Sequence, residues 1–198
     1  MKRRALLIGI DEYALLGDLR YARRDAEQFS SVLQERCGFD PGSVTLMSCH
    51  AKGGLLAQSR YIENKLNDLK EERDLDLLIV GFWGHGFAPQ AGQRYLCAVE
   101  TIENDLERTA VSLEVVKAML IQAQARDTLI ILDCCQNRPA GRSIAADPIS
   151  PGEEDAIQKM AHGIQAARDI QTSRMKDEPH TLPTVAVLSS CREGEKAY

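Results

Sequence analysis

The sequence is poor in aromatic residues and lacks the patterns that identify several common classes of protein. Only 5% of its 198 residues are Phe, Trp or Tyr. No stripe of Lys and Arg with interleaved aromatics occurs, so we predict no nucleic-acid partner. No apolar run is long enough to span a bilayer, so we predict no membrane segment. The 24 basic and 29 acidic side chains are interspersed and give a net charge of −5, which is typical of a solvated globular surface.

The six cysteines and four histidines do not have the spacing of a structural metal site. No CxxC pair is present, so we expect no metal and no cofactor. The basic start is followed by an apolar run, Ala5–Ile10, that is too short for a signal peptide, and Asp11 follows without a cleavage site. We therefore interpret this run as a strand, the cysteines as reduced and the protein as cytoplasmic.

The alternation of short apolar runs with helical periodicity predicts an α/β fold with a mostly parallel sheet. With 198 residues and 44% hydrophobic content, residues 1–198 suffice for a single domain. The expected strands are Arg4–Ile10, Ser43–Met47, Leu75–Phe82, Thr128–Leu132 and Thr184–Ser189, with a hairpin arm at Arg94–Val99. The expected helices carry apolar faces over Leu19–Leu33 (with Gly38 as the stop), Leu55–Leu69, Leu113–Leu120 (with Ser112 as the N-cap) and Ile157–Ala167. Residues 137–151 are predicted to be an exposed loop.

Residues with reactive side chains lie just after the expected strands. In an open parallel sheet, ligands and catalysis collect at the carboxyl ends of the strands. The third strand leads to His85, and the fourth leads to Asp133, Cys134 and Cys135. Cysteine and histidine are natural partners for nucleophilic catalysis, because a thiol is mostly protonated at neutral pH and needs a neighbour that removes its proton.

These residues favour His85 as a general acid/base and Cys135 as a nucleophile. Gly84 and Gly86 flank the histidine, and we expect them to let the backbone turn sharply and approach a substrate. The N–H groups of Gly86 and Cys135 are the predicted oxyanion hole for a tetrahedral intermediate. Another Cys-His acyl-transfer enzyme, such as an amidohydrolase, would fit the same chemistry, although its nucleophile more usually sits on a Gly-flanked turn.

The order of four segments resembles the caspase-like cysteine peptidases, most of all the bacterial and metacaspase branch of the peptidase C14 family. The similarity extends from the first strand to the C-terminal residues, and His85 and Cys135 have the separation typical of caspases. The segments are Leu6-Leu7-Ile8-Gly9-Ile10-Asp11-Glu12-Tyr13, Leu19-Arg20-Tyr21-Ala22-Arg23-Arg24-Asp25-Ala26, Phe82-Trp83-Gly84-His85-Gly86 and Ile131-Leu132-Asp133-Cys134-Cys135. The resemblance implies a three-layer α/β/α caspase-like fold and a cysteine endopeptidase with a protein or peptide substrate.

The resemblance also selects between the two adjacent cysteines. The family pattern is Asp, a small residue and then the nucleophile, which puts the nucleophile at Cys135 and leaves Cys134 as a packing residue. The sequence departs from the metacaspase pattern directly afterwards, where Gln136-Asn137-Arg138 replaces His-Ser-Gly. That departure concerns the loop after the nucleophile rather than the dyad.

The resemblance further implies a specificity pocket for a basic residue. In metacaspase-like enzymes, carboxylates at the positions of Asp25 and Asp133 line the first specificity (S1) pocket and select Arg or Lys before the scissile bond. Arg24 stands where the metacaspase pattern has Asn, so an ion pair with the adjacent Asp25 would weaken that preference. The alternative is that this segment is an ordinary solvated helix surface.

Activation and completeness are also expectations drawn from the family. In this family, cleavage between the fourth and fifth strands can accompany activation, which makes residues 138–180 a candidate processing segment. The alternative is that this segment is an ordinary surface loop and helix. Some relatives require calcium, and Glu100, Glu103 and Asp105 lie close together in the sequence, but a calcium site needs more oxygen ligands than these. The family sheet has one further strand, so the chain is large-subunit-like, and we expect the last strand to be missing. A processed subunit, a shortened chain and half of an assembly completed by a second chain or downstream domain remain open, as does a non-catalytic scaffold.

Overall fold

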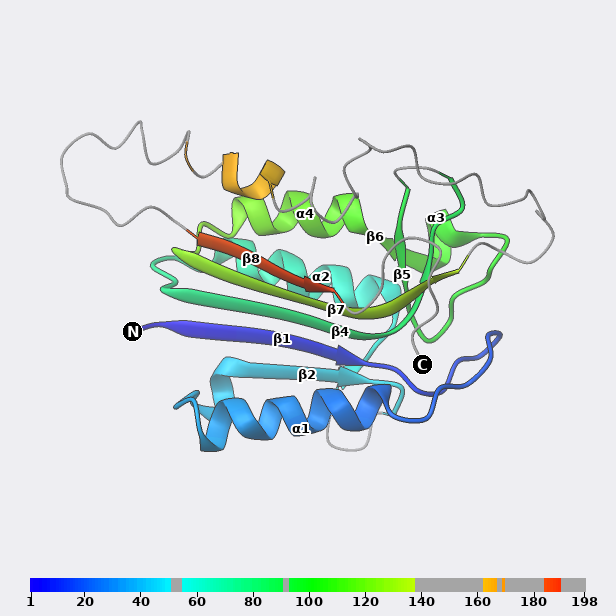
Figure 1. Cartoon of the computed structure of the whole chain (residues 1–198), viewed down its shortest axis with the longest axis horizontal. Helices are drawn as coiled ribbons and strands as arrows, with labels where there is room; N and C mark the ends of the chain where they lie inside the picture. Colours follow the sequence, from blue (N-terminus) through cyan, green and yellow to red (C-terminus); the bar gives the residue numbers. More distant parts are fainter. Residues whose placement is uncertain (51–54, 91–92, 138–161, 167–168, 170–183, 190–198) are drawn as a thin grey trace.

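A mostly parallel β-sheet forms the middle layer of the molecule (Figure 1). The computed structural model describes residues 1–50, 55–90, 93–137, 162–166, 169 and 184–189, and residues 135–137 by their backbone alone. The six strands that run parallel are ordered β3-β2-β1-β4-β7-β8. Their bounds are β1 (Arg3–Gly9), β2 (Val44–Ser48), β3 (Leu55–Leu56), β4 (Leu77–Phe87), β7 (Asp127–Asn137) and β8 (Thr184–Ser189).

A short antiparallel arm extends from the carboxyl end of β4. Strand β5 (Tyr95–Cys97) pairs with Gly86 and Phe87 of β4, and β6 (Ala110–Ser112) pairs with β5. The short helix α3 (Leu106–Thr109) connects the two strands of the arm. The arm expected around Arg94–Val99 is therefore confirmed, whereas β6 was not predicted because three residues are too few to show a periodicity.

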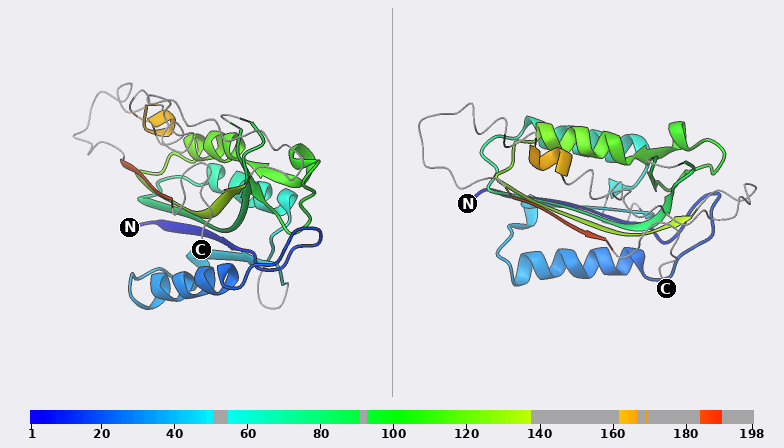
Figure 2. Two further views of the ribbon diagram at one scale, coloured as in Figure 1. Left: turned by 45° about the vertical axis from the view of Figure 1, so that its right-hand side comes forward. Right: turned by 45° about the horizontal axis from the view of Figure 1, so that its top comes forward.

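Helices cover both faces of the sheet, which gives three layers. Helix α1 (Ala22–Glu35) lies on one face, and α2 (Ser59–Glu71) and α4 (Leu113–Gln122) lie on the other (Figures 1 and 2). A single 3-10 turn, η1 (Pro41–Ser43), precedes β2. Residues 162–166 are helical, and the side chain of Ile164 in this segment is completely buried. None of the helices in the described ranges is long and apolar enough to cross a membrane.

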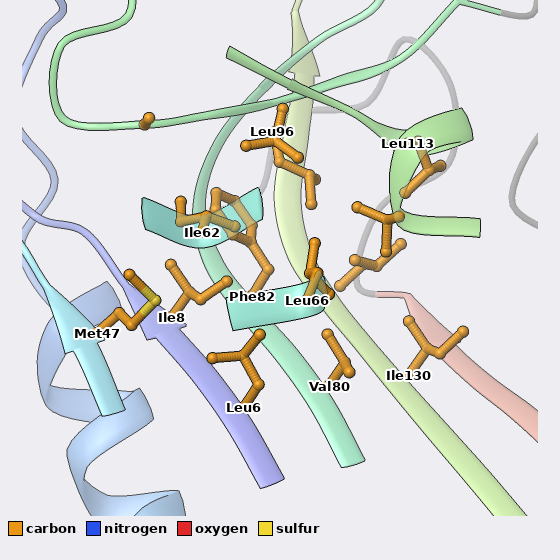
Figure 3. Close-up of a cluster of buried hydrophobic side chains, with 14 of the residues drawn as sticks. Leu6, Ile8, Met47, Ile62, Leu66, Val80, Phe82, Leu96, Leu113 and Ile130 are labelled. Carbon is orange, nitrogen blue, oxygen red and sulfur yellow. The ribbon is translucent and has the colours of Figure 1, made fainter. Parts of the chain in front are cut away.

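Alternation along the strands separates the core into two clusters. In β4, Leu78, Val80 and Phe82 face α2 and α4, while Ile79 and Trp83 face α1. The larger cluster consists mostly of aliphatic side chains of the sheet and of α2 and α4, together with aromatic residues such as Phe82 (Figure 3). Because both faces of the central strands are buried, these strands are nearly continuous apolar runs rather than alternating ones.

Several element boundaries differ from those expected from the sequence. Strands β4 and β7 continue to Phe87 and Asn137, so His85 and Cys135 lie inside paired strands rather than beyond them. The expected sharp turn at His85 is wrong, because Gly84, His85 and Gly86 are all paired with β7 as part of the continuous strand β4. Leu55 belongs to β3 rather than to the following helix, and Leu19 precedes α1.

Other expectations are confirmed at the level of single residues. Gly38 terminates the α1 segment in the left-handed region, and the Phe39 N–H beyond it donates to the carbonyl of Leu33. Ser112 is the N-cap of α4, and its hydroxyl accepts from the N–H of Glu114. Strand β8 has the predicted bounds, and among the described strands it pairs with β7 alone. The loop at 137–151 and most of the helix at 157–167 lie outside the described residues.

Candidate active site

The predicted dyad residues are directly opposite each other in adjacent parallel strands. His85 of β4 and Cys135 of β7 are Cα partners in the sheet register. This pairing belongs to one continuous parallel register that runs from Leu77↔Asp127 to Phe87↔Asn137. The structure therefore brings the two backbones together at the carboxyl end of the sheet, where chemistry is expected.

His85 also contacts the loop after β1, residues 11–19. The hydroxyl of Tyr13 accepts a hydrogen bond from the backbone N–H of His85 at 2.8 Å. The Tyr13 and His85 rings are tilted by 44°, with centroids 4.9 Å apart. Nε2 of His85 lies 2.7 Å from the carbonyl oxygen of Gly17. These contacts link the histidine backbone, one ring face and one ring nitrogen to the same short loop.

The contact with Gly17 assigns the tautomer of the neutral imidazole. A carbonyl oxygen only accepts hydrogen bonds, so Nε2 of His85 must carry the proton and donate it. In the neutral ring the other nitrogen, Nδ1, then carries the lone pair. The arrangement leaves Nδ1 as the basic nitrogen of His85.

Gly84 has a different role from the one predicted. A Cβ atom at this position would lie 2.6 Å from the Tyr13 hydroxyl oxygen and 3.0 Å from a ring carbon of Phe82. The glycine therefore provides the space in which Tyr13 reaches the strand, and it does not form a turn. Burial raises the pKa of the Tyr13 hydroxyl well above its ordinary value, although the hydrogen bond from the His85 N–H opposes this rise, so the phenol stays neutral beside the histidine.

The loop that carries Tyr13 and Gly17 is itself held at its base. The N–H of Leu19 donates to the carbonyl of Asp11, and the N–H of Tyr13 donates to the carboxylate of Asp18 at 3.2 Å. The buried carboxylate of Asp11 accepts the N–H of Arg23 in the first turn of α1 at 3.0 Å. Asp11 thus caps α1 from outside the helix, a role that replaces the missing side-chain cap at Tyr21.

The predicted oxyanion-hole residues, Gly86 and Cys135, lie within the paired part of the sheet. Because Ile10 donates to the carbonyl of Trp83, odd-numbered residues in this part of β4 direct their backbone groups toward β1. Gly86 therefore faces β7 with its N–H, and the register Gly86↔Gln136 directs the N–H of Cys135 toward β4. In this arrangement both N–H groups face the neighbouring strand.

The two predicted pocket carboxylates lie on the α1 side of the sheet or on α1 itself. Asp25 is half-buried in the first turn of α1. Asp133 is half-buried opposite Trp83, and strand alternation puts it on the same face as Leu129 and Ile131. Within the described ranges neither carboxylate has a hydrogen-bond or ion-pair partner, and the exposed Arg24 does not pair with Asp25.

Two of the three acidic residues considered for calcium bind other side chains. Glu100 accepts from the N–H and the hydroxyl of Ser59 at the start of α2, and Asp105 forms an ion pair with Arg108. In the part of the chain that the structure describes, no group of three His, Cys, Asp or Glu side chains is arranged to share a metal ion. Cys134 is buried in the large core cluster.

Comparison with known proteins identifies the family. The model of the caspase domain family, Peptidase_C14, matches residues 2–198. The chain belongs to this family. A crystal structure of a protein from Geobacter sulfurreducens is similar to this caspase domain with a TM-score of 0.59 and 18% identity, over 98% of this chain and 74% of that one. At this identity the likeness shows the fold alone.

A structure of pro-Sf-caspase-1 also matches the caspase domain, with a TM-score of 0.44 and 17% identity. The match covers 78% of this chain and 52% of that chain. A comparison with curated proteins finds no significant match. The match to the family model confirms the caspase-like recognition, and the sheet itself confirms the mostly parallel α/β fold expected from the sequence.

Sequence reasoning missed Tyr13 and Gly17 as parts of the site, and it did not assign the capping contact of Asp11. Tyr13 and Asp11 lie within a segment that carries the family resemblance, so their positions were visible, but nothing in the spacing assigns them a contact. Gly17 acts through its backbone carbonyl, which no side-chain pattern reveals.

Proposed function

We propose that this caspase domain is a cysteine endopeptidase in which Cys135 is the nucleophile and His85 is the general acid/base. The observation that supports it best is the direct register of His85 and Cys135, combined with a histidine whose Nε2 is occupied by Gly17. The family match supports peptidase chemistry at a coarser level.

The proposed reaction follows the balance of a thioester mechanism. Nδ1 of His85 takes the proton of the Cys135 thiol, and the thiolate attacks the carbonyl carbon of the scissile peptide bond. The tetrahedral intermediate collapses to a thioester as the imidazolium returns the proton to the leaving amine. Water, activated by His85, then hydrolyses the thioester, releasing the carboxylate product and regenerating the thiol.

The oxyanion hole in this mechanism consists of the N–H groups of Gly86 and Cys135. Because both face the neighbouring strand in the present arrangement, substrate binding must turn them toward the substrate carbonyl. Cleavage in the 138–180 segment, or calcium, is a candidate trigger for this change, and a second chain or downstream domain that completes the sheet is another. The same observation favours the second candidate function, a non-catalytic caspase-like scaffold.

We propose a preference for Arg or Lys before the scissile bond. The half-buried carboxylates of Asp25 and Asp133 lack cationic partners in the described ranges, and a buried charge without a partner is costly. A basic side chain of the substrate would supply that partner through charge-assisted hydrogen bonds. This preference agrees with assignment to the metacaspase branch. The four cysteines whose side chains the structure describes form no disulfide, which agrees with a cytoplasmic protein.

Fluorogenic peptides ending in Arg, Lys or Asp test the proposal, with and without calcium and with Cys135→Ala as the matched control. Cleavage after Arg or Lys that disappears in Cys135→Ala supports both the dyad and the pocket. Cleavage after Asp supports the dyad and refutes the pocket. Absence of cleavage, together with no labelling of Cys135 by a thiol-reactive peptide probe with a basic residue, supports the scaffold.

A further inference from the structure

On the side of β4 that faces β1, the backbone of His85 has no strand partner among the described residues. Strand β1 pairs with β4 only as far as Gly9 and Trp83, and the last backbone bond between them is Ile10 N–H to the carbonyl of Trp83. His85 is two residues further along β4, so its N–H points toward the same side, where β1 has already turned away. A strand N–H at such a position needs another acceptor, because an unpaired buried N–H is costly.

The Tyr13 hydroxyl supplies that acceptor from the loop that follows β1. It lies 2.8 Å from the His85 N–H, in space that exists only because residue 84 is glycine. Tyr13 is itself 8% exposed, so the hydrogen bond is shielded from water. The chain thus replaces a strand partner by a side chain at the residue where the imidazole must be held.

Tyr13 also connects the two other constraints on His85. Its ring packs against the imidazole, and its N–H is bound by Asp18 next to Gly17, whose carbonyl accepts from Nε2. A displacement of Tyr13 would therefore move the backbone of His85 and the carbonyl that determines its tautomer at the same time.

We propose that Tyr13 is a positioning residue for His85, whose hydroxyl replaces the missing strand partner and keeps the imidazole in the Nε2–H tautomer with Nδ1 available as the base. This inference rests on the proposed function only for its effect on catalysis. The geometry of His85 itself is measurable in an inactive protein.

The test compares Tyr13→Phe with Tyr95→Phe in the full chain. Both substitutions remove a hydroxyl from a tyrosine of the same core cluster, but in the described residues the hydrogen bond and the ring contact of His85 involve Tyr13 and not Tyr95. Nitrogen-15 spectra of the histidine rings, with His85 assigned through a His85→Gln variant, report the tautomer. We expect the Nε2–H form in the wild type and in Tyr95→Phe, and a mixture of tautomers in Tyr13→Phe. The same tautomer in all three proteins overturns the proposal.

Kinetics give a second, separable measurement. In an active enzyme, Tyr13→Phe should lower kcat roughly tenfold or more with little change in KM, as expected for a misplaced catalytic group. Tyr95→Phe should leave kcat close to that of the wild type. An equal kcat in the two variants contradicts positioning by Tyr13. If no peptide is cleaved by any protein while the tautomer changes as expected, the endopeptidase proposal fails and the positioning inference stands.

Asp18 provides a surface position for an independent check. Asp18→Asn retains an oxygen that can accept from the Tyr13 N–H, whereas Asp18→Ala removes it. We expect Asp18→Ala to give a mixture of His85 tautomers, as Tyr13→Phe does. Asp18→Asn should give the same spectrum as the wild type. Asp18 is exposed, so neither variant should unfold the protein, and identical spectra for Asp18→Ala and the wild type count against the loop as the support of Tyr13.

Discussion

At the scale of single residues, the site depends on side chains that accept hydrogen bonds from backbone N–H groups near the end of β1. Tyr13 satisfies the His85 backbone beyond the end of β1, and Asp11 caps α1 from the same end of the same strand. Each of these residues is buried, so its hydrogen bond is not exchanged readily with water. The residues that support the proposed catalysis are therefore also elements of the fold.

The space beside His85 leads to a first prediction. Gly84→Ala would place a Cβ 2.6 Å from the Tyr13 hydroxyl, so either Tyr13 or β4 must shift. We expect a loss of about 1–3 kcal/mol in the free energy of unfolding, as for other overpacked core positions. Gly42→Ala is the matched control, since nothing lies within 4 Å of a Cβ there. Urea denaturation measures both, and equal stability of the two variants would contradict the tight contact.

The pocket carboxylates lead to a second prediction, which depends on the proposed specificity. Asp25→Asn and Asp133→Asn should each lower kcat/KM for peptides ending in Arg by roughly 10- to 100-fold, because each removes a charged partner of the substrate side chain. Asp40→Asn is the control, since Asp40 is an exposed carboxylate before β2. Unchanged kcat/KM in both pocket variants would refute the assignment while leaving the dyad intact.

At the scale of secondary-structure elements, helix termini are stabilised by local signals and by distant ones. Ser112 caps α4 from within its own sequence, as its position predicts. Helix α1 has no side-chain cap at Tyr21 and takes its cap from Asp11 across the loop. Glu100 likewise accepts from Ser59 at the first turn of α2, although the two residues are 41 positions apart.

The distant cap of α1 leads to a third prediction. Asp11→Ala removes the acceptor of the Arg23 N–H and the carboxylate near the Arg23 side chain. We expect it to destabilise the domain by about 1 kcal/mol, similar to the loss of an ordinary N-cap. Ser112→Ala should show a loss of the same size, and Asp40→Ala, whose side chain makes no cap hydrogen bond, should show little. A stability of Asp11→Ala equal to that of Asp40→Ala would contradict the capping role.

At the scale of the whole molecule, a charged cluster joins the first strand to the segment that follows α2. Glu72 forms ion pairs with Lys2 and with Arg4. Burial raises the pKa of the Glu72 carboxyl, but hydrogen bonds and charges from Arg4 and Lys2 outweigh it, and the net pKa is lowered from its ordinary value. This cluster lies at the amino end of the sheet, far along the strands from His85.

The lowered pKa of Glu72 leads to a fourth prediction, on pH dependence. A carboxyl with a lower pKa in the folded than in the unfolded state contributes stability above its unfolded pKa and loses it as pH falls through the folded one. The wild type should therefore lose more stability than Glu72→Gln as pH falls from neutral into the acidic range below the ordinary glutamate pKa. Unfolding free energies by urea at several pH values measure this, and parallel pH profiles would contradict it.

Much of the architecture could be predicted from the sequence alone. Buried apolar runs such as Leu77–Val80 are typical of strands with both faces covered, so the mostly parallel α/β sheet could be predicted from periodicity, whereas the three layers were implied by the family resemblance. Gly38 and Ser112 acted as predicted because helix ends depend on local backbone conformation and local hydrogen bonds. The rule for the carboxyl ends of strands led to His85 and to the pair Cys134 and Cys135 for a similar reason, since it depends only on strand direction. The family resemblance then selected Cys135 from that pair.

The tertiary structure decided what lies around these residues. The extension of β4 and β7 past His85 and Cys135, the hydroxyl of Tyr13 over Gly84 and the carbonyl of Gly17 on Nε2 all depend on segments that are distant in the sequence or act through the backbone. Periodicity describes how one segment meets a core, but it contains no information on which loop meets which strand. The chemistry of the dyad could therefore be predicted from residue types, whereas the orientation and the tautomer of its histidine became evident only in the folded chain.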